Sequence, residues 1–168
     1  RVSSGQVQPH TKFIFRSASA RIVWLIQASR EMWDFAADGE LHCEKVVGRF
    51  AQSLLERWSK LGAGHSLTVI MFCRTFYDSV DPAVAAARAI QHDVDGRPFE
   101  DFFQVVIENK TYAGAEWPSL LPTLKRAFKR FPSIANWGGP HGGLPSASSD
   151  GNFLEALNMS LNIFHKHY

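Results

Sequence analysis

Residues 23–35 constrain the fold of this chain more than any other segment. The segment begins as the apolar run Val23-Trp24-Leu25-Ile26 and then places polar side chains at alternate positions. Such an apolar run is typical of a strand that is buried on both faces of a parallel sheet. The polar residues that follow lie at the carboxyl end of the strand, where open α/β sheets bind ligands. The sequence therefore predicts an α/β fold with a candidate site directly after this strand.

The rest of the chain supports this class because strand patterns and helix patterns alternate along it. Between residues 40 and 61, apolar side chains recur at spacings of three and four, which predicts a long helix with Gly62 as its stop. Gly48 would permit this helix to pack closely on the sheet. The expected strands are 11–16, 21–27, 66–76 and 101–109, and the expected helices are 40–61, 82–90, 117–131 and a last one from about residue 150. Residues 133–149, rich in Gly, Pro and Ser, are expected to form a flexible loop.

Composition narrows the classes of partner. Eighteen Lys and Arg against sixteen Asp and Glu give a net charge of +2, which is too balanced for nucleic acid or an acidic membrane as the main partner. No apolar run reaches the roughly 18 residues of a membrane-spanning helix, and residues 1–12 contain no signal peptide. The chain is long enough for a single domain, residues 1–168, and the lack of an initiator Met suggests a fragment. Cys43 and Cys73 lie in apolar patterns and are expected to be reduced core thiols.

The residues after the first buried strand resemble a metal site with altered ligands. In the von Willebrand factor A fold this strand ends in Asp-x-Ser-x-Ser, whose oxygens bind Mg²⁺. Here the corresponding positions are Gln27, Ser29 and Glu31, and Asn152 stands where a coordinating Thr would be. Gln27 offers a neutral amide instead of a charge, so we expect a degenerate site without metal. A metal-dependent A-type protein-binding module remains the alternative.

Catalytic patterns are absent from the sequence, and we expect neither an enzyme nor a cofactor. The chain contains no Gly-x-Ser-x-Gly motif, no Gly-x-x-x-x-Gly-Lys phosphate loop and no metalloprotease spacing of His.

Two sets of charged residues are candidates for contacts. The first is a basic helix face that is either solvated or a surface for an acidic partner: Lys125, Arg126, Lys129 and Arg130. The second set could form ion pairs around strand ends: Asp34, Arg74, Asp78 and Asp101.

Several separated motifs, in a fixed order, resemble the Iml family of vacuolar membrane-associated, DEP-domain-containing proteins. The resemblance covers residues 11–168. The motifs are Thr11-Lys12, Phe15-Arg16-Ser17, the segment 26–35, Arg74-Thr75-Phe76-Tyr77-Asp78, the segment 96–103, the segment 151–158 and His167-Tyr168.

This resemblance implies a function. Family members are the largest subunit of the GATOR subcomplex (SEACIT in yeast), which activates the GTPase of Rag-type GTPases. Through it they restrain TOR complex one when amino acids are scarce, at the cytoplasmic face of the vacuolar or lysosomal membrane, with consequences for autophagy. The matched region resembles the structural-axis domain that holds the nitrogen-permease-regulator-like subunits, one of which carries the catalytic arginine. The resemblance thus implies a non-catalytic scaffold domain.

The same resemblance predicts an incomplete sheet. An A-type fold has further strands after the last helix expected here, so we expect a partial von Willebrand factor A-like sheet with flanking helices that lacks its later strands. An unpaired edge of that kind favours association with another strand.

Overall fold

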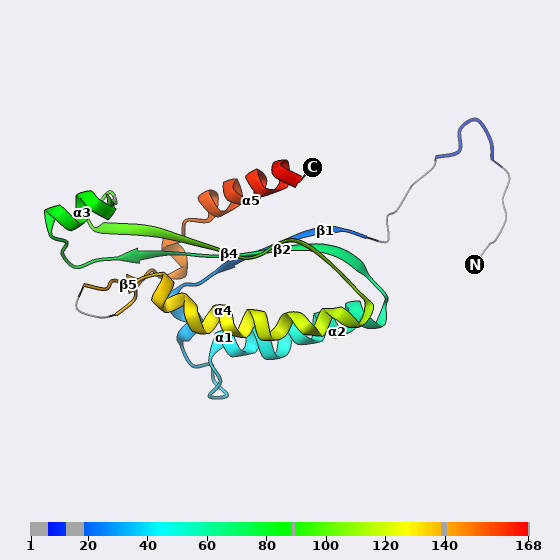
Figure 1. Cartoon of the computed structure of the whole chain (residues 1–168), viewed down its shortest axis with the longest axis horizontal. Coiled ribbons are helices and arrows are strands. Elements are labelled where there is room, and N and C mark those ends of the chain that lie inside the picture. Colours follow the sequence, from blue (N-terminus) through cyan, green and yellow to red (C-terminus); the bar gives the residue numbers. More distant parts are fainter. Residues whose placement is uncertain (1–6, 13–18, 89, 139–140, 168) are drawn as a thin grey trace.

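The computed structural model describes residues 7–12, 19–88, 90–138 and 141–167 of the 168-residue chain. Helices lie on both faces of a five-stranded mixed sheet, so the predicted α/β class is confirmed (Figure 1). The strands are β1 (Arg21–Gln27), β2 (Gly64–Phe76), β3 (Gln91–His92), β4 (Pro98–Ala113) and β5 (Leu144–Pro145). The helical segments are η1 (Arg30–Trp33), α1 (His42–Lys45), η2 (Val46–Ala51), α2 (Gln52–Lys60), α3 (Pro82–Arg88), η3 (Gly114–Leu120), α4 (Leu121–Ile134), η4 (Ser148–Asp150) and α5 (Phe153–His167).

β2 is the central strand of the sheet, whose order is β1-β2-β4-β3. β1 runs parallel to β2, and β4 runs antiparallel to it on the other side. β5 pairs with the last two residues of β2, past the end of β1 and on the same edge. Because β2 is covered on both faces, its residues 67–73 are all buried. Among the described residues, no strand pairs with the outer edge of β1.

The pairing of β2 with β4 contains two bulges, one between Leu67 and Val69 and one between Val69 and Ile70. β4 carries one extra residue in each. At the first, Asn109 adopts a φ of 42°, and its N–H donates to Thr68 Oγ1 at 3.0 Å. β4 is therefore longer and more irregular than the strand predicted over 101–109.

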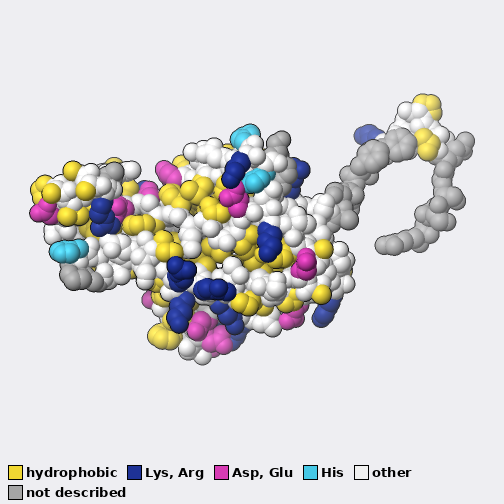
Figure 2. Space-filling view, in the orientation of Figure 1, with side chains coloured by type: hydrophobic (Ala, Val, Ile, Leu, Met, Phe, Trp, Pro, Cys, Tyr) yellow, Lys and Arg dark blue, Asp and Glu magenta, His cyan; other side chains and the backbone are white. Residues whose placement is uncertain are grey.

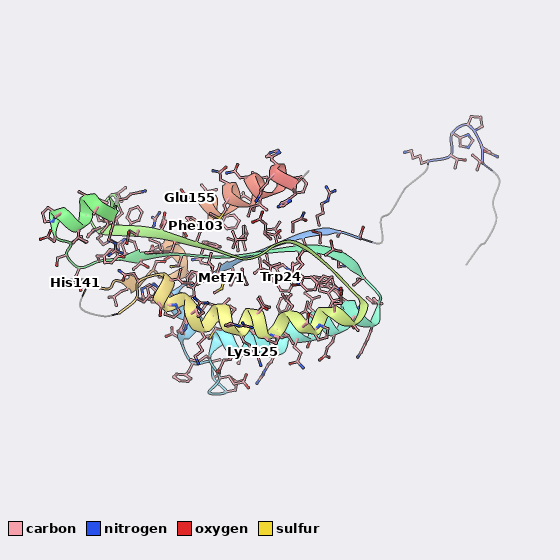
Figure 3. The ribbon with its side chains drawn as sticks, in the orientation of Figure 1. Trp24, Met71, Phe103, Lys125, His141 and Glu155 are labelled. Atoms are coloured by element: carbon pink, nitrogen blue, oxygen red, sulfur yellow. The ribbon has the colours of Figure 1, made fainter. Side chains whose placement is uncertain are left out.

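One face of the sheet is covered by α1, η2 and α2 together with η3 and α4 (Figure 1). Trp24 and Met71 point from the sheet toward these helices (Figure 3). Trp117 is fully buried, and its indole N–H donates to the carbonyl oxygen of Ala63 at 2.8 Å. Its ring meets that of Trp58 edge to face, with centroids 4.7 Å apart. The main core thus lies on this side of the sheet.

α5 lies on the opposite face (Figure 1). It contacts the sheet through small side chains, because Ala156 and Ser160 are its buried residues. Four apolar side chains of this helix, spaced by three and four residues, are exposed instead: Leu154, Leu157, Leu161 and Phe164. We call these four residues the α5 stripe.

The predicted long helix 40–61 is present as α1, η2 and α2, with a π-helical middle segment. Its buried residues Cys43, Val47, Ala51 and Leu55 are spaced by four, which suits the wider turn of a π-segment. Gly48 is turned away from the sheet, and a Cβ added there would meet no atom within 4 Å. The prediction that Gly48 permits close packing on the sheet is therefore wrong.

Three further predictions concern a helix, a loop and a strand. The helix predicted over 82–90 is present as α3. The predicted loop 133–149 contains the end of α4, β5 and the start of η4. In the strand predicted over 11–16, residues 13–16 lie outside the described residues, and residues 11–12 are not in a strand.

Candidate functional site

The polar residues after β1 lie at the carboxyl end of that strand, as the sequence predicted. The N–H of Ala28 still donates to the carbonyl of Phe72 at 2.8 Å, so the parallel register extends one residue past the strand. The N–H of Arg30 then donates to the carbonyl of Ser146 at 3.0 Å. This bond brings the segment 146–150 against the start of η1. The candidate site is therefore closed on one side by a segment distant in sequence.

Gln27 and Glu31 both bind the backbone of Ser148. The side-chain amide of Gln27 donates to the Ser148 carbonyl at 2.9 Å, and the Ser148 N–H donates to Glu31 Oε1 at 3.2 Å. A Cβ at Gly151 would lie 2.3 Å from Gln27 Nε2, so only glycine fits there while Gln27 keeps this position. Gln27, Glu31 and Ser148 together form a clasp between η1 and the segment before α5.

Hydrogen bonding lowers the pKa of the Glu31 carboxyl. The Ser29 hydroxyl makes the largest contribution, and backbone N–H groups, including that of Ser148, and the charge of Arg30 act in the same direction. Desolvation opposes them. Glu31 is therefore ionised at neutral pH, which is the form that accepts the bond from Ser148.

Asn152, the fourth predicted position, is buried beside β2. Its side-chain amide donates to the carbonyl of Cys73 at 3.3 Å, and its main-chain carbonyl accepts the N–H of Ala156 at 3.2 Å. Asn152 therefore fixes the start of α5 on the central strand.

The four positions do not fit a magnesium site of the A type. Mg²⁺ prefers oxygen ligands in octahedral geometry, with carboxylates among them. Here Gln27 and Asn152 direct their amide nitrogens at backbone carbonyls, and Glu31 is the single carboxylate, with one of its oxygens accepting the N–H of Ser148. Within the described ranges, no group of three or more His, Cys, Asp or Glu side chains could hold a metal ion. The arrangement can brace the loop, and we derive no metal chemistry from it.

The basic face lies on α4, away from this clasp. The side chains of Lys125, Arg126, Lys129 and Arg130 are exposed, and none has an acidic partner in the part of the chain that the structure describes. Figure 2 shows Lys and Arg side chains gathered over α4 and α1, beside Asp and Glu side chains. Lys125 and Lys129 border a groove between α4 and the α1–η2 segment, whereas Arg126 and Arg130 do not.

Of the charged residues proposed for ion pairs, Arg74 and Asp101 come together. The guanidinium makes two hydrogen bonds to the carboxylate, at 2.8 and 2.9 Å, and lies 3.8 Å from the ring centroid of Phe99. This pairing raises the pKa of Arg74. Asp34 and Asp78 form no ion pair with a described residue. In a second cluster, which no motif in the sequence indicates, Arg88 of α3 contacts both Tyr77 and Glu100.

Both cysteines are free and buried. Burial raises the pKa of the Cys73 thiol to about 12 and also raises that of Cys43. A thiol must ionise to act as a nucleophile, so neither side chain is placed for covalent catalysis.

Comparison with known proteins finds a matching family model and relatives of similar sequence. Residues 19–168 match the family model for the vacuolar membrane-associated protein Iml1, vWA-like domain. The chain is 41% identical over 172 residues to a DEP domain-containing protein of Dictyostelium discoideum and 38% identical over 178 residues to the GATOR complex protein Iml1 of Drosophila melanogaster, with the whole chain covered in both. It is 32% identical over 193 residues to the vacuolar membrane-associated protein iml1 of Schizosaccharomyces pombe, with 98% of the chain covered.

The match covers a small part of these relatives. The chain spans 8% of the Dictyostelium protein, 11% of the Drosophila protein and 13% of the Schizosaccharomyces protein. Within the described residues, no helix has both the length and the apolar character needed to cross a membrane.

Proposed function

Since the chain belongs to the family of the vWA-like domain of vacuolar membrane-associated protein Iml1, we propose that it is a non-catalytic scaffold domain of a GTPase-activating complex. In this proposal the complex acts on Rag-type GTPases and restrains TOR complex one when amino acids are scarce. The domain acts at the cytoplasmic face of the vacuolar or lysosomal membrane as a peripheral component. A relative that covers the whole chain, the Drosophila Iml1, carries the name of a GATOR complex protein, which supports the proposal.

One structural observation carries the scaffold role. The polar side chains at the carboxyl end of β1 are used within the chain, because Gln27 and Glu31 both bind Ser148. The exposed face of α4, by contrast, carries four cations that have no acidic partner among the described residues. A domain whose polar side chains after β1 bind its own backbone, while a helix face presents cations without acidic partners among the described residues, is suited to hold partner proteins.

The proposed partners are the nitrogen-permease-regulator-like subunits, with Rag-type GTPases contacted through the complex. The catalytic arginine belongs to one of those subunits in this proposal. The arginines of this chain therefore have structural or binding roles, as Arg74 does with Asp101.

Co-purification tests the proposal. The full-length protein that carries this domain should bind the regulator-like subunits equally well in Mg²⁺ and in EDTA. Arginine-to-alanine variants at Arg126 and Arg130 should leave the maximal GTPase activation of an assembled complex unchanged. Failure of the folded protein to bind the subunits would overturn the scaffold role. Binding or thermal stabilisation that requires Mg²⁺ and is abolished by Ser29→Ala would favour the metal-dependent A-type module instead.

A further inference from the structure

A groove of about 620 Å³ lies between α4 and the segment from η1 to η2. Its floor is apolar and includes Trp33, Val47 and Phe128. Lys125 and Lys129 border it on the α4 side, one helical turn apart. Lys125 projects from α4 beside α1 (Figure 3). The volume is in the range that holds one or two bulky side chains or a small ligand.

The two walls of the groove differ in whether their charged side chains form ion pairs. On the α1–η2 side, Arg49 pairs with Glu40 at 2.9 Å and with Asp38 at 3.3 Å, and Lys45 pairs with Asp38 at 2.7 Å. The charges of that wall are therefore largely satisfied within the domain.

The α4 wall lacks such partners. Lys125 and Lys129 form no ion pair with any residue in the described ranges, and Glu44 is the one lining carboxylate that is likewise unpaired there. The groove consequently presents an apolar floor with a surplus of positive charge along one rim. An occupant that combines an apolar side chain with carboxylates would complement both features.

We propose that this groove binds an acidic segment of a partner protein, which inserts a bulky apolar side chain between α4 and η2 and places carboxylates against Lys125 and Lys129. The inference rests on the proposed scaffold role, because it locates one of the contacts that such a scaffold needs. Central apolar anchors surrounded by charged rims are the usual arrangement of binding energy at interfaces.

Gly48 supports the groove as a place for an incoming side chain. It lines the groove, and a Cβ added to it would have open space on all sides within 4 Å. Its backbone φ is not in the left-handed region. A Cβ at this position therefore meets no neighbouring atom, and a larger side chain there is expected to occupy the groove and to compete with the partner's side chain.

The two pairs of basic residues on α4 provide a matched control. Lys125 and Lys129 border the groove, while Arg126 and Arg130 lie on the same two turns and do not line it. Charge reversal of either pair changes the net charge by the same amount. Any difference between the variants in partner binding therefore reports the location of the contact and not the overall charge.

The experiment measures binding of the full-length protein to the purified regulator-like subunits at physiological salt. Lys125→Glu with Lys129→Glu, and separately Gly48→Leu, should each weaken binding by about tenfold or more. Arg126→Glu with Arg130→Glu should change it by less than about threefold. Zero-length coupling of lysine to carboxylate, followed by mass spectrometry, should join Lys125 or Lys129 to an Asp or Glu of a subunit.

The possible outcomes distinguish a failure of the groove inference from a failure of the proposed scaffold function. If the wild-type protein does not bind the subunits, the scaffold proposal itself fails. If it binds and the groove variants bind equally well, the scaffold stands and the groove inference is overturned. Equal weakening by both charge reversals, with no effect of Gly48→Leu, would also overturn it. So would coupling of Lys125 and Lys129 only to carboxylates of the same polypeptide or of a second copy.

Discussion

The two faces of the sheet are covered in opposite ways. Toward α2 and α4, large side chains interlock, and Trp117 and Phe131 are completely buried. Toward α5, the helix rests on Ala156 and Ser160, while Leu154 remains 74% exposed and Leu161 50% exposed. The apolar residues of the sheet are enclosed on both faces, since Ile70 and Phe72 on the α5 side are also buried, but the apolar side chains of α5 itself remain exposed.

This contrast shows that an apolar helical stripe does not by itself identify a core. The α5 stripe adjoins β1, whose outer edge is unpaired among the described residues, and Val23 on that strand is also exposed. Exposed apolar groups gathered in this way mark a surface where other chain segments bind. The expectation that further strands extend the sheet stays a prediction.

The strongest test of the contrast is Trp117→Ala. Removing a fully buried indole leaves a cavity beside Trp58 and also leaves the Ala63 carbonyl without its donor. We expect the free energy of unfolding to fall by about 3–5 kcal/mol, measured by urea denaturation. A loss below about 1 kcal/mol would show that the face toward α2 and α4 is not the dominant core.

Asp101→Asn tests whether polar contacts hold the α5 side of the sheet. The substitution removes a carboxylate that makes two hydrogen bonds to Arg74, and both side chains are mostly buried. We expect a loss of about 1–3 kcal/mol in the same denaturation assay. The exposed pair of Arg49 with Glu40 is the control, since solvent screens it and Glu40→Gln should cost much less than Asp101→Asn. Equal effects would mean that burial of the Arg74 pair is unimportant.

The α5 stripe itself should be almost neutral for stability. Leu154→Gln and Leu161→Gln keep good helix formers at exposed positions, so each should change the free energy of unfolding by less than about 0.5 kcal/mol. On the buried side of the same helix, Ala156→Leu should destabilise by about 1–3 kcal/mol through overpacking. A reversed order, measured by thermal or urea unfolding, would mean that α5 docks through its leucines.

The smallest effect concerns the last turn of α5, which Lys166 and His167 fasten to Glu108 at 2.7 and 2.8 Å. These contacts, with Lys166 the largest, lower the pKa of the Glu108 carboxyl below its usual 4.5. A lowered folded pKa means that the contribution is complete above the unfolded pKa and is lost as the pH falls through the folded value. Amide exchange in the last turn, corrected for intrinsic rates, should therefore lose protection in acid. Glu108→Gln should remove this pH dependence, and an unchanged profile would contradict the assignment.

The pattern of apolar residues along the sequence predicted several helices and strands correctly. β1, the helix before β2 and α4 follow from apolar spacing alone, and Cys43 and Cys73 are buried as their surroundings indicated. The exposure of the α5 stripe could not be predicted in this way, because the spacing of apolar residues is the same whether a helix packs on a sheet or awaits another partner. Gly48 faces away from the sheet because it lies in the π-segment, and no residue pattern in the sequence predicts that segment.

The candidate site was predicted in position but not in its contacts. Alternating polar residues after an apolar strand located Gln27, Ser29 and Glu31 at the edge of the sheet. The shared partner of Gln27 and Glu31, Ser148, is more than a hundred residues away and contributes only backbone atoms, so its side-chain identity carried no signal. The groove beside Lys125 likewise depends on the packing of α4 against η2, which is a property of the tertiary structure.

The paired bulges in β4 have a consequence for how this domain tolerates changes in length. Each bulge adds one residue to β4, and beyond it the paired residues of the two strands again face the same side. The core face of β4 therefore passes from even to odd positions at one bulge and back to even positions at the other, so that Phe102, Ile107 and Tyr112 all belong to it. The bulges thus mark the places in β4 where a change of one residue in length is absorbed, whereas the same change elsewhere in the strand is expected to move the following side chains to the opposite face.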